Sequence, residues 1–121
     1  MSRGQSRRII VRMAYDEKLA KRVSVLIAKK KGFREQKMFG GVGFLLHNNM
    51  CVGVWREYLI LRLGIERAGQ ALKSGETRPF DITGHVMKGW VMVKPAGTKT
   101  DSALKAWVSQ SIAFVSKLPR K

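Results

Sequence analysis

The spacing of apolar residues near the start of the chain predicts an amphipathic α-helix. Four apolar residues recur at i, i+4, i+7 and i+8, which places them on one helical face. They are Leu19, Val23, Leu26 and Ile27. Asp16 precedes them as an N-cap, and Gly32 follows three lysines as a C-terminal stop. We therefore expect a first helix over about residues 16–31.

The pattern then changes to short apolar runs separated by turn residues. We expect four strands here, over residues 34–38, 42–47, 50–55 and 58–63. Asn48-Asn49 suits the positive-φ positions of a two-residue hairpin, and Arg56-Glu57 makes a second tight turn. Connections this short require the strands to pair antiparallel.

The segment Lys37-Met38-Phe39-Gly40-Gly41 stands at the entrance to this apolar region. Two glycines after an aromatic residue allow a positive φ or a close approach of two backbones. The Lys-Ser/Thr pair of a phosphate-binding loop does not follow them, and neither does a helix signal. We interpret the segment as a hinge between two strands.

The remaining pattern completes an α+β domain. It predicts a short middle helix over residues 65–73, an irregular connector over 78–84 and a fifth strand over 87–93. A long C-terminal helix begins at Thr100 or Asp101 and stops at Leu118-Pro119. We expect two layers, with the helices against an antiparallel meander of about five strands. The predicted core comprises Leu19, Val23, Leu26, Phe39, Phe44, Leu61, Val91, Leu104, Trp107 and Val108.

Length and cysteine usage narrow the class of protein. A chain of 121 residues corresponds to one domain. The single cysteine, Cys51, has no partner for an internal disulfide, and the basic N-terminus lacks the apolar core of an export signal. No run approaches the roughly 18 apolar residues of a membrane span. We expect a cytoplasmic protein without a membrane partner.

The charge changes this picture most. Twenty-four Lys and Arg residues face eight acidic residues, for a net charge of +16. A net charge of about 2–8 suffices to keep a small domain soluble, so the excess indicates a polyanionic partner, with DNA or RNA first and an anionic membrane surface second. General basicity without a function is the alternative. We expect residues 1–12 to form a basic extension before a domain over 13–121. The predicted nucleic-acid-binding residues are Arg3, Arg7, Arg8, Arg12, Lys29, Lys30, Lys31, Arg34 and Lys37.

Residue types that carry catalysis or bind metals are sparse. His47 and His85 lack a Cys, His or Asp at ligand spacing, so no metal site is predicted. Cys51 is better explained as a buried strand thiol than as a nucleophile. Asp81 is the carboxylate of most interest, because Arg62 is in a position to reach it across the fold as a structural ion pair. Neither an enzymatic activity nor a cofactor or small-molecule substrate is predicted.

Three tryptophans have two interpretations each. Trp107 lies on the regular apolar face of the last helix and is assigned to the core. Trp55 and Trp90 lie at strand ends, where packing is favoured. The alternative for these two is base stacking, since aromatic residues interleaved with basic ones form platforms for single strands.

Five motifs in order carry a resemblance to a known family. They are Met13-Ala14-Tyr15-Asp16, Lys37-Met38-Phe39-Gly40-Gly41, Tyr58-Leu59-Ile60-Leu61-Arg62, Pro79-Phe80-Asp81 and Met87-Lys88-Gly89-Trp90. Together, over roughly Met13 to Pro119, they resemble the N-terminal domain of the TfoX/Sxy competence regulators. The resemblance implies a two-layer α+β domain and a link to transcriptional control of natural competence. Two-domain members carry a second, helical domain after this one, so this chain resembles a stand-alone N-terminal domain. The family brings no catalytic residues.

Three functions remain in competition at this point, and the third, a small enzyme of unknown reaction, would be favoured by a deep pocket with convergent polar groups and perturbed pKa values. The first is a non-enzymatic regulatory or adaptor domain that resembles the TfoX competence regulators and contacts nucleic acid through a basic surface. The alternative is a module for protein interaction or self-association, as a homodimer, without a role in nucleic-acid binding. Clustered positive charge favours the first function, and an apolar surface patch favours the second.

Overall fold

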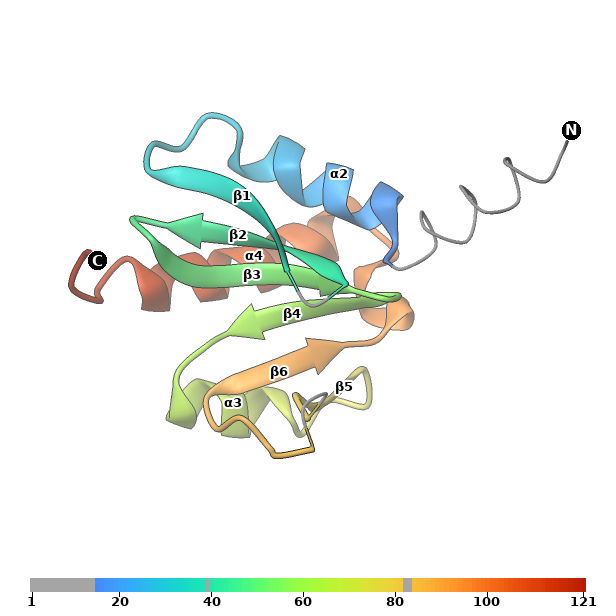
Figure 1. Cartoon of the computed structure of the whole chain (residues 1–121). Helices are drawn as coiled ribbons and strands as arrows, with labels where there is room; N and C mark the ends of the chain where they lie inside the picture. Colours follow the sequence, from blue (N-terminus) through green and yellow to red (C-terminus); the bar gives the residue numbers. More distant parts are fainter. Residues whose placement is uncertain (1–14, 39, 82–83) are drawn as a thin grey trace, which may run out of the picture.

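A six-stranded antiparallel sheet forms the centre of the molecule, and its helices lie behind it in Figure 1. The computed structural model describes residues 15–38, 40–81 and 84–121. The elements, labelled as in Figure 1, are α2 (Glu17–Ile27), β1 (Phe33–Met38), β2 (Gly41–Leu46), β3 (Asn49–Trp55), β4 (Tyr58–Arg62), α3 (Ile65–Ala71), β5 (Thr77–Pro79), β6 (Trp90–Val93), a 3-10 helix η1 (Pro95–Thr98) and α4 (Asp101–Val115). The strand order is β1-β2-β3-β4-β6-β5. The predicted α+β class and its three helices are confirmed.

Helix α2 is shorter than the predicted 16–31. Its start is as expected, because Oδ1 of Asp16 accepts a hydrogen bond from Leu19 N at 3.0 Å. It ends at Ile27, where Lys30 N bonds back to Ile27 O at 3.0 Å in a tighter turn. Lys29–Lys31 are exposed and bury no apolar surface that would extend the helix.

The hairpin between β2 and β3 turns one residue earlier than predicted. His47 and Asn48 adopt positive φ (50° and 67°), whereas Asn49 pairs with Leu46 as the first residue of β3. The side chain of Asn49 is buried and donates from Nδ2 to Pro119 O at 2.9 Å, which holds it in the strand. The assignment of Asn48-Asn49 as the turn pair was therefore wrong by one position.

Strand β5 is absent from the sequence-based expectation, which assigned residues 78–84 to an irregular connector. It pairs antiparallel with β6, with Thr77 opposite Val93 and Pro79 opposite Val91. A proline is tolerated there because β5 is the last strand of the sheet. The strand β6 is shorter than the predicted 87–93 and begins at Trp90.

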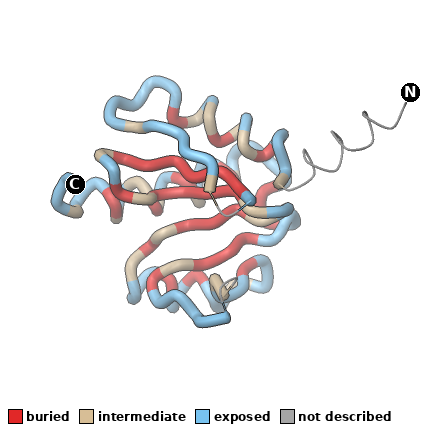
Figure 2. Tube along the Cα trace, in the orientation of Figure 1, coloured by how far each residue is buried: buried red, intermediate tan, exposed pale blue. Residues whose placement is uncertain are grey.

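The core lies between the sheet and the helices, where Figure 2 shows buried residues along the middle strands. Seven of the ten predicted core residues are confirmed as buried: Leu19, Val23, Phe44, Leu61, Val91, Leu104 and Val108. Leu26 is half-buried, because it lies at the margin of the face that α2 turns to the core. Trp107 is also half-buried, and its Nε1 donates to Gly97 O at 3.2 Å. Phe39 lies outside the described residues.

The hinge between β1 and β2 behaves as the glycine pair suggests. Met38 pairs with Gly41, so the chain reverses over two residues, and Gly40 has a φ of 77°. Gly41 itself packs against the backbone oxygen of Val54, in the space that a Cβ would occupy. The second glycine is therefore needed for close approach of two strands, and the first for the turn.

Cys51 lies in β3 with no exposed surface, which confirms the interpretation as a buried strand thiol. Burial raises the pKa of the Cys51 thiol to about 12, although the positive charge of Arg62 opposes the rise. A thiol in this state carries almost no thiolate at neutral pH, and the thiolate is the reactive form.

The first prediction concerns Gly41. Substitution of Gly41→Ala places a methyl group against the backbone of Val54, which cannot move without separating β2 from β3. We expect the free energy of unfolding in urea to fall by about 2 kcal/mol. Gly75→Ala is the matched control, because a Cβ at Gly75 meets no atom within 4 Å among the described residues. Equal effects of the two substitutions would contradict the proposed packing.

The second prediction concerns the pH dependence of stability. The folded-state pKa of Cys51 lies above its ordinary value of 9.0, so the unfolded chain loses this proton first. The contribution of the thiol to stability is fully present below about pH 9 and is lost as the pH rises toward about 12. As the pH rises from 8 to 10, we expect the free energy of unfolding of the wild-type chain to fall by about 1 kcal/mol more than that of Cys51→Ala. Parallel pH profiles would show that the thiol is accessible to water.

The third prediction concerns Trp107. We expect Trp107→Ala to lower the free energy of unfolding by about 3 kcal/mol, the lower end of the range for buried aromatic residues, because the ring is only half-buried. Trp107→Phe keeps most of the packing and removes the hydrogen bond to Gly97, for a loss of about 1 kcal/mol. A loss below about 1 kcal/mol for the alanine variant would identify Trp107 as a surface residue.

Candidate functional site

Most positive charge on the molecule has no acidic partner. All eight acidic residues and 20 of the 24 basic residues lie within the described part of the chain. Two salt bridges occur there, between Arg22 and Asp101 at 3.2 Å and between Arg78 and Asp81 at 3.8 Å. The excess of cations is therefore exposed to solvent and available to an anionic partner.

Several of these cations meet around the β2–β3 turn. His47 N donates to Gly32 O at 2.9 Å, which brings the lysines at 29–31 beside the turn. From the other side, Asn48 Nδ2 donates to Lys121 O at 3.1 Å, and Lys121 N donates to His47 O at 3.2 Å. The α2–β1 loop, the β2–β3 turn and the C-terminus consequently lie at one end of the sheet, as Figure 1 shows.

We call this group the turn cluster. It comprises Lys29, Lys30, Lys31, Arg34, Arg120 and Lys121, all of them exposed. Arg34 is held in place because its Nε donates to Asn48 Oδ1 at 3.0 Å and its Nη1 donates to Gln36 Oε1 at 2.8 Å. Glu35, the acidic residue nearest in sequence, instead accepts a hydrogen bond from Ser24 Oγ at 2.7 Å. The backbone of the turn cluster is thus held together, and Arg34 is the member whose side chain is also held by hydrogen bonds.

The structure brings together only part of the predicted nucleic-acid-binding set. Lys29, Lys30, Lys31 and Arg34 lie in the turn cluster. Lys37 is exposed but pairs with Val42 on the helix side of β1, away from Arg34. Arg3, Arg7, Arg8 and Arg12 lie outside the described residues. Tyr15, where the described chain begins, pairs with Arg56 at the opposite end of the sheet.

Sequence reasoning missed Arg120 and Lys121. Leu118-Pro119 correctly ended the last helix, but no local signal showed that the following residues turn back to β3. The amide of Asn49, which bonds to Pro119 O, makes that return. The sequence alone does not show this contact of Asn49, because its partner, Pro119, is seventy residues away.

The predicted ion pair between Arg62 and Asp81 does not form. Asp81 pairs with Arg78, three residues earlier, at 3.8 Å. The guanidinium of Arg62 instead lies 5.5 Å from the ring centroid of Trp90, and its Nη1 lies 3.4 Å from Met50 O. The register opposite β6 places Arg62 directly across from Trp90, which accounts for this contact.

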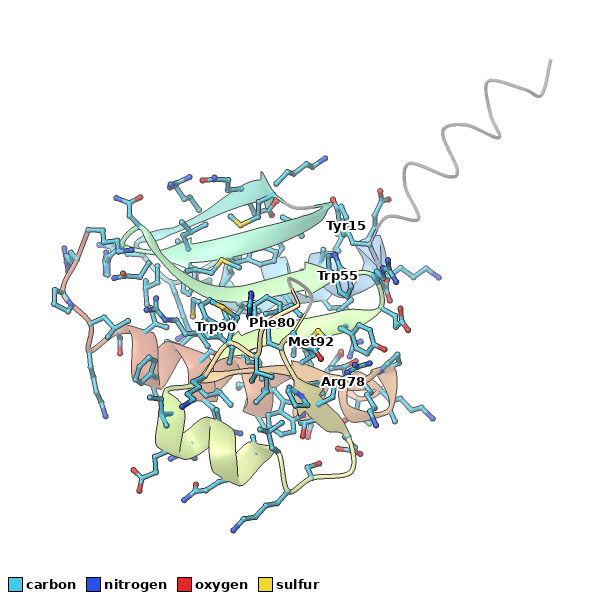
Figure 3. All side chains as sticks on the ribbon, turned by 60° about the horizontal axis from the view of Figure 1, so that its bottom comes forward. Tyr15, Trp55, Arg78, Phe80, Trp90 and Met92 are labelled. Atoms are coloured by element: carbon cyan, nitrogen blue, oxygen red, sulfur yellow. The ribbon has the colours of Figure 1, made fainter. Side chains whose placement is uncertain are left out.

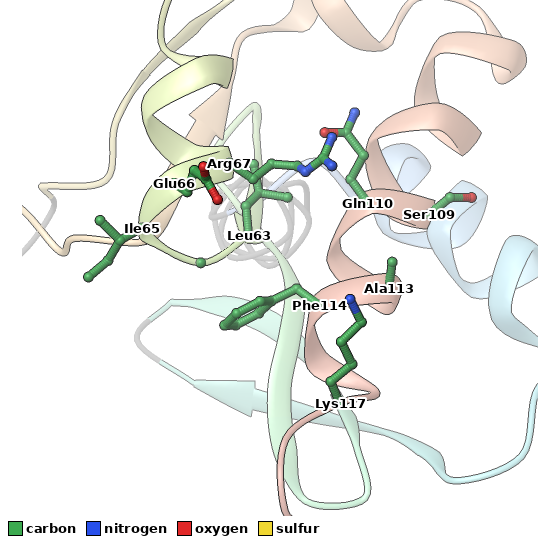
Figure 4. Close-up of a pocket in the computed structure, with 10 residues that line it drawn as sticks. Leu63, Ile65, Glu66, Arg67, Ser109, Gln110, Ala113, Phe114 and Lys117 are labelled. Atoms are coloured by element: carbon green, nitrogen blue, oxygen red, sulfur yellow. The ribbon is translucent and has the colours of Figure 1, made fainter.

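A groove of about 500 Å³ opens between the start of α3 and the last turns of α4 (Figure 4). Its lining includes Glu66, Arg67, Gln110, Phe114 and Lys117. Glu66 is the only carboxylate on this lining, and no cysteine or histidine accompanies it there. The groove therefore lacks a nucleophile with an adjacent base, although its apolar wall can accept a ligand.

The residues with metal-ligating or reactive side chains are dispersed. In residues 15–38, 40–81 and 84–121, no three His, Cys, Asp or Glu side chains come together as a ligand set. His47 occupies the β2–β3 turn, and its ring packs closely on Gly32: a Cβ added at Gly32 would lie 2.7 Å from His47 Nδ1. His85 is exposed. Among the described residues, no helix has both the length and the apolar character needed to cross a membrane.

Comparison with known proteins assigns the fold to a family. A family model described as the TfoX N-terminal domain matches residues 26–115, most of the 121-residue chain. That family is not an established family of enzymes. Searches of curated proteins and of solved structures gave no significant match. The matched segment runs from the end of α2 through all six strands to the end of α4. The chain belongs to the TfoX N-terminal domain family.

Proposed function

We propose that this TfoX N-terminal domain is a non-enzymatic regulatory or adaptor domain that contacts nucleic acid through the turn cluster. The observation that carries the proposal is the convergence of three separate segments around His47 and Asn48, which gathers six cations. Side chains held at one end of a sheet can neutralise several neighbouring phosphates at once. The excess of Lys and Arg and the single buried cysteine suit a cytoplasmic location, where nucleic acid is the abundant polyanion.

Contact of this kind depends on the phosphate backbone. The long helix α4 turns Leu104, Val108 and Val115 to the core, so this face is not free to enter a major groove. Helix α2 likewise buries Leu19 and Val23. Binding would therefore be driven by counterion release and would differ little between sequences.

A second candidate function is protein interaction through the groove between α3 and α4. Ile65, at its rim, is 71% exposed, and Phe114 forms part of the wall. An exposed aliphatic residue beside an apolar groove favours a protein partner or a second copy of the chain. Sedimentation of the protein alone over a range of concentrations tests self-association, and Ile65→Lys should abolish it if it occurs through this groove.

The fourth prediction concerns the salt dependence of duplex binding. If the turn cluster neutralises about five phosphates, log K should fall with log salt at a slope near −4.5 on mixed-sequence DNA. Replacing Lys29, Lys30 and Lys31 together by Gln removes three contacts and should reduce the slope by about 2.7. Fluorescence anisotropy with a labelled duplex at several salt concentrations measures both quantities.

The matched control replaces three exposed lysines outside the turn cluster, Lys73, Lys99 and Lys105, by Gln. It removes the same net charge and should leave most of the slope intact. Deletion of residues 1–12 measures the additional contribution of Arg3, Arg7, Arg8 and Arg12. Equal reductions of the slope in the two triple variants would show that binding depends on total charge and not on a defined site. Absence of binding at low salt would leave protein interaction as the function.

A further inference from the structure

The face of the sheet that carries no helix in the described structure has a distinct composition. Alternation along the paired strands places these side chains opposite the core, and we call their surface the open face. It carries Arg34, Gln36, Met38, Leu45, Met50, Trp55, Tyr58, Ile60, Arg62, Arg78, Trp90 and Met92, with Gly43 paired to Gly53 at its centre. Figure 3 shows Trp55, Phe80, Trp90, Met92 and Arg78 across this surface. Leu45, Ile60 and Met92 are buried beneath their neighbours on this face, whereas the aromatic residues Trp55, Tyr58 and Trp90 are half-buried.

Four aromatic residues on the open face form two pairs. Trp55 and Tyr58 are directly opposite across β3 and β4, with ring centroids 6.3 Å apart and planes inclined by only 18°. Phe80 and Trp90 lie 5.6 Å apart at an angle of 40°. All four side chains are half-buried, so each pair also presents ring surface to the outside. The pairs therefore offer two separate platforms for a planar ligand.

Each platform carries arginine. The guanidinium of Arg56 lies 4.6 Å from the centroid of Trp55, and that of Arg78 lies 5.8 Å from Tyr58. At the other platform, Arg62 lies 5.5 Å from Trp90. These three contacts place a guanidinium group beside each pair of rings.

A groove of about 340 Å³ runs beside Trp90. Its lining includes the cationic side chains of Arg62 and Lys88 as well as Gly89 and Phe114. Its volume falls in the range of small-ligand sites, and its charged groups are both positive. A flat anionic ligand, or one base with its phosphate, is the chemistry that this lining fits.

We propose that the open face binds single-stranded nucleic acid. Bases stack on the Trp55–Tyr58 and Phe80–Trp90 platforms, while Arg56, Arg62 and Lys88 contact the adjacent phosphates. The inference rests on the proposed function in assuming a nucleic-acid partner, and it adds the form of that partner and a second site. Stacking on aromatic residues tolerates any sequence, because every base has a planar face.

The geometry disfavours a duplex at this site. Six strands at about 4.8 Å spacing span roughly 24 Å, which is twice the width of a major groove. In a duplex the planar faces of the bases are already stacked on one another, so only their edges are available. Half-exposed rings on a broad sheet therefore suit unpaired bases.

The charges disfavour a second copy of the chain as the occupant. A symmetric dimer through the open face would bring Arg56, Arg62 and Arg78 of one copy toward the same residues of the other. Three carboxylates lie nearby: Asp81 pairs with Arg78, Glu57 is exposed in the β3–β4 turn, and Asp16 lies beside Arg56. Asp81 is already paired and Asp16 accepts the N-cap hydrogen bond of α2, so both sets of arginines stay largely uncompensated. A polyanion meets no such repulsion.

The fifth prediction compares single-stranded and duplex binding. Labelled oligo(U) and oligo(dT) of 12 nucleotides, and a 12-base-pair duplex, are titrated against the full chain. Trp55→Leu and Trp90→Leu keep an apolar cover over the sheet but remove a stacking surface. Each should lower single-strand affinity about 5- to 160-fold, since stacking contributes roughly 1–3 kcal/mol per base. Duplex affinity should change less than twofold.

Two controls keep the test decisive. Trp55→Phe retains a ring and should retain most single-strand affinity, which separates stacking from a folding defect. Trp107→Phe changes a tryptophan on the helix side and should leave binding unchanged. Quenching of tryptophan fluorescence by oligo(U) provides an independent signal, which should persist in Trp107→Phe and diminish in the leucine variants.

The outcomes distinguish the two proposals. Loss of single-strand binding alone in the leucine variants supports the open face. Unchanged single-strand binding in folded leucine variants overturns the proposal for the open face. The proposal for the turn cluster would still stand if the Lys29–Lys31 variant lost duplex affinity. Binding to an acidic peptide in place of every nucleic acid tested would overturn both proposals.

Discussion

The structure depends on a sheet that packs its helices against one face. In β4, Leu59 and Leu61 point to the helices, so alternation turns Tyr58, Ile60 and Arg62 the other way. Ile60 and Met92 are nevertheless 3% and 1% exposed. Their cover on the open face comes from neighbouring side chains, with Met50, Trp55 and Phe80 around a small apolar hollow above Ile60. Where the described part of the chain puts no helix over the sheet, broad side chains cover it, and aromatic rings with arginine stems supply them.

The same architecture separates the positive charge into two groups. The turn cluster lies at the His47–Asn48 end of β3, whereas Arg56 follows the other end of that strand. The seven residues of β3 separate Asn48 from Arg56, which corresponds to about 25 Å. This distance exceeds the Debye length of about 8 Å at physiological salt, so the turn cluster and Arg56 scarcely repel each other. Arg62 contacts Met50 and therefore lies nearer to the turn cluster. One flexible polyanion can contact both, whereas a small anion contacts only one.

Local signals account for the parts of the fold that the sequence predicted. Helical periodicity, an N-cap and short turns lie within a few residues of one another, and they predicted both terminal helices and the β1–β4 meander. The missed features depend on distant partners. Thr77–Pro79 has no alternation of its own and becomes a strand only because β6 offers Val91 and Val93. The β2–β3 turn moved by one residue because Asn49 bonds to Pro119, seventy residues away.

The two candidate surfaces likewise consist of parts that local sequence predicted and parts that depend on distant contacts. Lys29–Lys31 and Arg34 are close in sequence and were predicted, but Arg120 and Lys121 complete the turn cluster through contacts that sequence spacing does not show. On the open face, Trp55 and Tyr58 flank a predicted turn, whereas Phe80 meets Trp90 only because the chain between β5 and β6 folds back. The family match over residues 26–115 contains every residue of the open face and excludes Arg120 and Lys121. The aromatic platforms are therefore built by the domain itself, and part of the turn cluster is added by the residues that follow it.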